Sequence, residues 1–169
     1  ADRIACGGEL LRYKKFVYYM MNKPAGVVSA TSDGREQTVL SLLGKDAKDG
    51  IFPVGRLDKD TMGLLLLTDD GDLAHRLLSP RKHVDKVYRA TIAHKLAPED
   101  IRRLEEGLDI GEEKPTLPAR VKILEEREIL LTLHEGKFHQ VKRMLQAVDN
   151  QVMSLKRVSF GGLNLDEKL

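Results

Sequence analysis

The chain has 169 residues, which suits one large domain or two small subdomains that share a core, and its 41 % hydrophobic and 32 % charged residues are ordinary for a globular protein. Cys6 is the only cysteine, which excludes an internal disulfide and favours a reducing, cytoplasmic compartment. The apolar run Met62–Leu67 is far too short to cross a bilayer, so we expect no membrane association.

The first third of the chain predicts short strands separated by turns. Residues 1–15 mix glycine, charge and short apolar pieces, and we expect a tail or linker there. The aromatic and apolar segment 16–21 predicts a strand, and 27–30 predicts a second short one. Segment 38–43 predicts a short helix whose first residue, a threonine, caps it, and 52–54 predicts another strand.

The middle of the chain alternates between strands and helices without a regular order. The unbroken apolar run 64–67 predicts a buried strand. After an Asp-Asp-Gly turn, 72–78 predicts a helix, which a Ser-Pro pair ends. Segment 86–93 predicts a strand, and 98–107 predicts a helix with proline in its first turn and glycine at its end.

The last third predicts two paired strands, a helix and a final strand. Segments 121–124 and 129–133 flank a charged turn and predict an antiparallel pair. Apolar residues recur at helical spacing in 138–148, and 152–160 predicts a last strand. Many short strands with interspersed helices indicate an α+β fold with a largely antiparallel sheet.

Charge is unevenly distributed along the chain. Segment 76–89 holds five Lys or Arg residues against the single acid Asp85, whereas 99–113 holds seven acids against two arginines. A basic face and an acidic face suit a protein that orients a polyanion, but both segments are equally compatible with ordinary solvated surfaces.

A carboxylate directly after a predicted strand is the first candidate for chemistry. Gly55-Arg56-Leu57-Asp58 follows the strand 52–54, at a position where catalytic groups often lie. The same residues also suit a structural turn in which Asp58 caps the next segment. Lys142 and Arg143 lie on the predicted helix 138–148, where they are either solvated or, for Lys142 at the core boundary, able to meet a carboxylate.

Metal-binding patterns fit poorly. A calcium loop starting at Asp58 would have Met62 at its fifth position and Asp69 at its twelfth, which excludes it. Turn formation and helix capping explain the acids 69–72 and His75 better than a metal does. His134 and His139 are five residues apart, so they do not have the i, i+4 spacing of helical zinc ligands.

Several segments, taken together, resemble the RsuA-like pseudouridine synthases that modify ribosomal RNA. The similarity runs in order from about Phe16 to Leu169. Its blocks are Asn-Lys-Pro-Ala-Gly at 22–26, Phe-Pro-Val-Gly-Arg-Leu-Asp at 52–58, 63–71, 73–80 with Lys86 and Tyr88, Glu-Gly-Lys-Phe-His-Gln-Val-Lys-Arg-Met at 135–144, and 161–163. The block 139–144 is similar to the small-subunit branch, which acts on 16S rRNA.

The resemblance implies a pseudouridine synthase fold, in which a largely antiparallel mixed sheet with flanking helices surrounds a central RNA-binding cleft. It implies that residues 1–15 are a linker left from a missing N-terminal S4-type domain. Residues 16–169 would then be the catalytic domain, with its C-terminal strand clipped.

The resemblance also assigns roles to residues. Asp58 is similar to the catalytic aspartate, Lys142 to the basic residue that pairs with it, and Tyr88 to the tyrosine that stacks on the uracil. Because uridine isomerisation involves no net redox change, no cofactor or metal is expected. The expected RNA contacts are Arg56, Arg76, Arg81, Lys82, Lys86 and Arg143.

The predicted partner is ribosomal RNA or the assembling small ribosomal subunit, bound by a monomer. Three other functions stay open at this point: an enzyme acting on 23S rRNA, a non-catalytic RNA-binding assembly factor, and a metal-dependent phosphoesterase that uses the acids between Asp58 and Asp72.

Overall fold

A computed structural model of the chain describes residues 3–6, 9–12 and 15–169. Within the predicted tail it places two short antiparallel strands, β1 (Arg3–Cys6) and β2 (Glu9–Arg12). The sequence analysis did not predict this hairpin. Residues 1–2, 7–8 and 13–14, also part of the predicted tail, lie outside the described residues.

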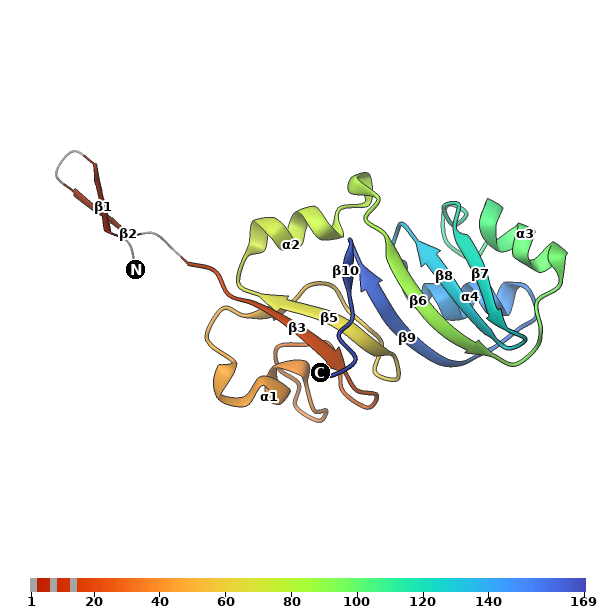
Figure 1. The fold of residues 1–169 in the computed structure, drawn as a ribbon, viewed down its shortest axis with the longest axis horizontal. Coiled ribbons are helices and arrows are strands. Elements are labelled where there is room, and N and C mark those ends of the chain that lie inside the picture. The colour runs from red at the N-terminus through yellow and green to blue at the C-terminus, as the bar shows by residue number, and fades with distance from the viewer. Residues whose placement is uncertain (1–2, 7–8, 13–14) are drawn as a thin grey trace.

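The main sheet has eight strands and is almost entirely antiparallel. Its order is β3-β5-β9-β6-β8-β7, with β4 added beside β5 and β10 beside β9 (Figure 1). The strands are β3 (Tyr18–Lys23), β4 (Phe52–Pro53), β5 (Met62–Thr68), β6 (Lys86–Ile92), β7 (Arg120–Glu125), β8 (Glu128–Leu133), β9 (Val152–Phe160) and β10 (Leu163–Asn164). The parallel contact joins β5 to β9 through the pairs Met62–Lys156 and Gly63–Arg157.

Helices flank this sheet. They are α1 (Val39–Leu43), α2 (Gly71–Leu78), α3 (Pro98–Glu106) and α4 (Gln140–Ala147), with short 3₁₀ turns η1 (Gly44–Asp46) and η2 (Pro80–Lys82). Helix α2 begins where the Asp70 carboxylate accepts a hydrogen bond from the Leu73 amide at 3.1 Å. This contact confirms helix capping for one of the acids considered above as a metal ligand.

Strand β5 is buried on both faces, which explains its unbroken apolar sequence. Leu65 and Leu67 pack with residues of α1 on one face, and Leu64 packs with Ala74 of α2 on the other. These are two clusters, and a third, larger one joins β6, β8 and β9 to α3 and α4. The sheet therefore has two packed halves, which meet along the contact between β5 and β9.

The predicted α+β class and largely antiparallel sheet are confirmed. The strand predicted at 27–30 is wrong: only Val28 pairs there, in a single bridge with Thr38. The Thr38 cap is confirmed, because its hydroxyl accepts from the Ser41 amide at 3.2 Å. Helix α4 begins two residues later than predicted, because His139 has a left-handed backbone conformation (φ 49°) that no helix continues.

No helix in the described part of the chain is long and apolar enough to span a membrane.

Candidate active site

Asp58 lies on the loop between β4 and β5, and buried polar side chains fix the backbone of this loop. The Lys23 ammonium is fully buried and donates to the carbonyls of Asp58 at 3.1 Å, Lys59 at 3.2 Å and Thr61 at 2.8 Å. The buried hydroxyl of Ser29 donates to the Leu57 carbonyl at 2.9 Å and accepts from the Leu57 amide at 3.0 Å. The end of β3 and the segment that follows it therefore set the position of Asp58.

The Asp58 carboxylate faces two side chains from the segment around α4. Lys142 Nζ lies 3.1 Å from Oδ2 of Asp58, and His139 Nε2 lies 3.3 Å from Oδ1. The predicted pairing of Asp58 with Lys142 is confirmed. About a quarter of each of these two side chains is exposed, so the pair lies at the floor of an accessible site.

Lys142 is shared between two carboxylates. Its Nζ also lies 2.6 Å from Oδ1 of Asp60, whose side chain is 72 % exposed. Burial alone would lower the pKa of Lys142, but hydrogen bonds to Asp60 and Asp58 outweigh it, so the pKa is raised. The same hydrogen bond lowers the pKa of Asp60. Lys142 is therefore an ammonium cation throughout the physiological range.

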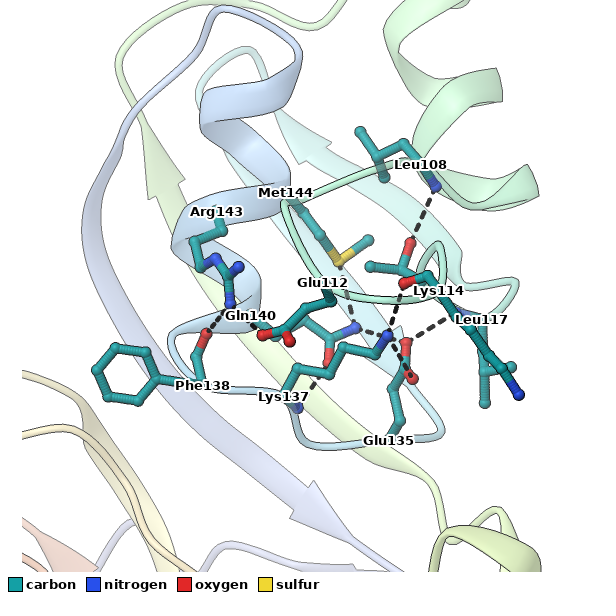
Figure 2. Close-up of polar contacts among 11 residues, drawn as sticks. Leu108, Glu112, Lys114, Leu117, Glu135, Lys137, Phe138, Gln140, Arg143 and Met144 are labelled. Atoms are coloured by element: carbon teal, nitrogen blue, oxygen red, sulfur yellow. Dashed lines mark hydrogen bonds and ion pairs between the residues drawn. The ribbon is translucent and has the colours of Figure 1, made fainter.

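The loop that carries His139 is held by a network of polar contacts shown in Figure 2. Glu135 Oε1 accepts from the Leu117 amide at 2.7 Å and from Gln140 Nε2 at 2.9 Å, and Gln140 Oε1 accepts from the Lys137 amide at 2.9 Å. Lys137 Nζ in turn donates to the Lys114 carbonyl at 2.9 Å. These contacts tie the loop to segment 108–117, so the start of α4 is fixed relative to the sheet.

The site is a cleft made of three adjoining hollows. The first hollow is lined by Asp58, Tyr88, His139 and Lys142, among others, and has a volume of about 80 Å³. A second hollow of about 470 Å³ shares Asp58 and His139 with it and reaches Phe138. A third hollow, of about 250 Å³, shares Tyr88 with the first one. The carboxylate and the tyrosine therefore both line the cleft.

Tyr88 is half-buried on β6 and packs against both hydrophobic clusters that meet at the cleft. It lines the same hollow as Asp58 and Lys142, so the structure brings the three predicted catalytic residues together. Its ring is an apolar wall beside two charged groups, and such a wall can stack on a nucleobase.

The predicted RNA contacts divide into three groups. Arg56 is exposed and lines all three hollows, whereas Lys86 is 8 % exposed and lines the third. Arg76 on α2, and Arg81 and Lys82 on η2, are exposed.

Arg143 is occupied by internal contacts, and none of those that the structure records is with Asp58. Its guanidinium lies 2.7 Å from the Glu112 carboxylate and donates to the Phe138 carbonyl at 3.0 Å (Figure 2). It also donates to the Ile110 carbonyl at 2.5 Å. These contacts indicate a structural role in fixing the loop before α4.

Sequence reasoning did not predict that Asp60 and His139 belong to the site. Asp60 was considered only as a metal ligand, among the acids between Asp58 and Asp72, and His139 only as a zinc ligand and as part of the block 139–144. Among the described residues, the structure places no group of three His, Cys, Asp or Glu side chains where they could hold a metal ion. The signal that could have found Asp60 is its spacing from Asp58, because two carboxylates this close can both reach one ammonium group.

Residues 17–147 match the family model described as RNA pseudouridylate synthase. An uncharacterized RNA pseudouridine synthase of Bacillus subtilis is 51 % identical over 96 % of this chain and 70 % of its own length. The ribosomal small subunit pseudouridine synthase A of Escherichia coli is 41 % identical over 90 % of this chain and 66 % of its own length. The crystal structure of a pseudouridylate synthase superposes with a TM-score of 0.87 at 40 % identity, covering 95 % of this chain and 70 % of that one.

The cleft and these similarities define the class of protein: the chain belongs to the RNA pseudouridylate synthase family. It spans about two thirds of the length of the small-subunit enzymes that it matches.

Proposed function

We propose that this chain isomerises uridine to pseudouridine in ribosomal RNA, and that its substrate is the 16S rRNA of the small subunit. The observation that carries the proposal is the contact of Asp58 with Lys142, 3.1 Å apart, in a cleft walled by Tyr88. Relatives that are 40–45 % identical are named ribosomal small subunit pseudouridine synthase A, which supports this substrate over 23S rRNA.

The reaction breaks the N1–C1′ bond of uridine and forms a C5–C1′ bond, while a proton leaves C5 and N1 gains one. An ionised carboxylate can act as a nucleophile on the sugar or the base, or assist departure of the uracil. Asp58 supplies that carboxylate. The neighbouring ammonium group of Lys142, 3.1 Å away, holds this carboxylate in place in the cleft.

The uridine reaches Asp58 only when it leaves the base stack. Tyr88 then stacks on the everted base, and the exposed Arg56, which lines all three hollows, contacts the RNA beside it. Arg76, Arg81 and Lys82 contact phosphates, which position the RNA without reading its sequence. The protein would act as a cytoplasmic monomer on rRNA or the assembling small subunit.

Release of tritium from RNA labelled at C5 of uridine tests the proposal, because the C5 proton is lost to water when C5 bonds to the sugar. We expect the chain to release tritium from 16S rRNA and not from 23S rRNA transcribed in the same way. Release from 23S rRNA alone would contradict the assignment of 16S rRNA as the substrate. Binding of both RNAs with no release from either would favour a non-catalytic RNA-binding protein, and release that stops with a chelator would favour metal chemistry.

A further inference from the structure

Two buried cations lie in the third hollow of the cleft, and the chemistry of Asp58 does not use them. Lys86 on β6 is 8 % exposed and Arg157 on β9 is 3 % exposed. Lys86 Nζ lies 5.7 Å and Arg157 Cζ lies 4.7 Å from the centre of the Phe160 ring. Neither forms an ion pair with a carboxylate in the part of the chain that the structure describes. Buried charges are normally paired, so this arrangement needs an explanation.

A bulge in β9 brings these side chains together. Along the β6–β9 pair, Lys86 faces Phe160 and Val87 faces Ser159, but Tyr88 faces Arg157, so Val158 is skipped. The extra residue shifts the alternation of β9 by one. Arg157 and Phe160 therefore lie on the same face as Lys86 and Tyr88. Without the bulge, the guanidinium of Arg157 would point to the other face of the sheet.

The guanidinium of Arg157 is only partly satisfied. Its Nε donates to the Leu64 carbonyl at 2.9 Å, whereas its Nη2 is buried without a hydrogen-bond partner. Among the described residues, the other buried side-chain atom without a partner is Thr61 Oγ1, and Thr61 also lines the cleft. Unsatisfied buried donors are rare in folded proteins and are often completed by a ligand.

One acid, Glu135, also lines this hollow, but it does not neutralise the two cations. Its Oε1 is already occupied by Leu117 and Gln140. Burial and the charge of Arg157 lower the pKa of Lys86, and Glu135 only partly opposes them. Because Arg56, Lys86 and Arg157 line the hollow against this single carboxylate, positive charge is in excess next to the place where the uridine would enter.

We propose that Lys86 and Arg157 form a binding site for one phosphate group of the RNA backbone, next to the everted nucleotide. The proposal rests on the proposed function, because it takes the RNA as the source of the anion. The hollow has a volume of about 250 Å³ and shares Arg56, Tyr88 and Gly136 with the hollow that contains Asp58. A uracil carbonyl could accept a hydrogen bond there but would leave both charges uncompensated, whereas a phosphate compensates them.

The test is the salt dependence of binding to a uridine dodecamer, a single-stranded RNA that requires no knowledge of the modified position. Each lost phosphate contact makes the plot of log affinity against log salt less steep by about 0.7 for single strands. We expect that change in Lys86→Met. Lys122→Met removes the same charge from an exposed position on β7 and should keep the wild-type slope.

A second pair of variants keeps the buried cations in place. A Cβ atom at Gly136 would meet only Lys86 Nζ, at 4.0 Å, and the backbone there accepts a side chain. Gly136→Asp would therefore pair with Lys86 and compete with the phosphate, whereas Gly136→Asn has the same shape without the charge. We expect a less steep slope in Gly136→Asp and a wild-type slope in Gly136→Asn, even if Lys86→Met proves too unstable to measure.

Wild-type slopes in both Lys86→Met and Gly136→Asp would overturn the phosphate site, and weaker binding at an unchanged slope would indicate contact with the neutral base instead. The outcome is independent of catalysis. A protein that shows the slope changes but releases no tritium from rRNA would keep the phosphate site and lose the proposed function.

Discussion

At the scale of single residues, the site depends on the geometry around one carboxylate. Asp58 comes from the loop before β5, and its ammonium partner comes from α4, 84 positions later in the chain. Lys142 also holds Asp60, and His139 reaches the other oxygen of Asp58. Each of these side chains contributes differently to the charge around Asp58, so substitutions at the different positions should reduce activity to different extents.

Loss of Lys142 should reduce activity strongly without unfolding the chain. In Lys142→Met the ion pair that fixes the Asp58 side chain is gone, and a misplaced catalytic group costs roughly a hundredfold in rate. Lys122→Met, an exposed lysine on β7, serves as the matched control and should stay near the wild type. Tritium release under single-turnover conditions measures both, and equal losses in the two variants would refute the pairing.

Loss of Asp60 should have a smaller effect. Its side chain is 72 % exposed, and in Asp60→Asn Lys142 remains paired with Asp58. We expect the activity to fall less than about tenfold, because exposed ion pairs contribute little. An Asp60→Asn variant as inactive as Lys142→Met would show that Asp60 takes part in the chemistry itself.

The sequence predicted the central pair but not its neighbours, for a physical reason. Asp58 and Lys142 were found through motifs, and the core-facing pattern of Val141 and Leu145 places Lys142 at the core boundary. The contact between His139 and Asp58 depends on a left-handed backbone conformation at His139. Local sequence does not specify a left-handed conformation in a residue other than glycine. At His139, the contacts of Glu135 and Gln140 support this conformation.

At the scale of elements, the loop that carries Asp58 is built around a buried lysine. Burial lowers the pKa of Lys23 to about 8, although the charges of Asp60 and Asp58 oppose this effect. The folded chain therefore binds the Lys23 proton more weakly than the unfolded chain does. It follows that the contribution of Lys23 to the free energy of unfolding is smallest below about pH 8 and rises between pH 8 and the ordinary lysine value of 10.5.

Urea unfolding of the wild type and of Lys23→Met across this pH range measures that contribution. We expect the free energy of unfolding of the wild type, relative to that of Lys23→Met, to increase as the pH rises from 8 to 10.5. A difference that stays flat or falls would contradict the lowered pKa.

The contact between β5 and β9 requires glycine at position 63. Gly63 has a φ of +108°, and a Cβ atom there would lie 2.2 Å from the Arg157 carbonyl oxygen. Gly63→Ala should therefore lower the free energy of unfolding by more than about 3 kcal/mol, since the clash is with backbone that has no room to move. Denaturant unfolding measures this change.

Gly71→Ala is the control for this prediction. A Cβ atom at Gly71 meets nothing within 4 Å, and the residue begins α2. Its effect should stay within about 1 kcal/mol, because alanine is the better helix former. Similar effects at the two glycines would show that the β5–β9 contact tolerates a side chain.

At the scale of the whole molecule, the cleft lies between the two packed halves of the sheet. Figure 1 shows the half with α1 and β5 beside the half with α3 and α4. Asp58 lies on the loop that leads into β5, and Lys142 lies on α4 with His139 directly before it. Tyr88 packs against the clusters of both halves. The relative position of the halves therefore sets the distance between the catalytic carboxylate and its partner.

Most individual elements were predictable because each shows its own periodicity or end signals. The order of the strands was not, because the pairing of Gly63 with Arg157 joins segments more than ninety residues apart. The phosphate site at Lys86 and Arg157 depends on that pairing and on the bulge in β9. Neither has a signal in the local sequence, which is why Arg157 was not among the residues expected to contact RNA.

The measurement that tests the central claim most directly compares Asp58→Asn with the wild type in two assays on one preparation. Tritium release from labelled 16S rRNA should fall by at least about 10³-fold, since the variant keeps the shape of the site and loses the nucleophilic carboxylate. Affinity for the same RNA should stay within a few-fold of the wild type. An Asp58→Asn variant that still releases tritium at the wild-type rate would contradict the account.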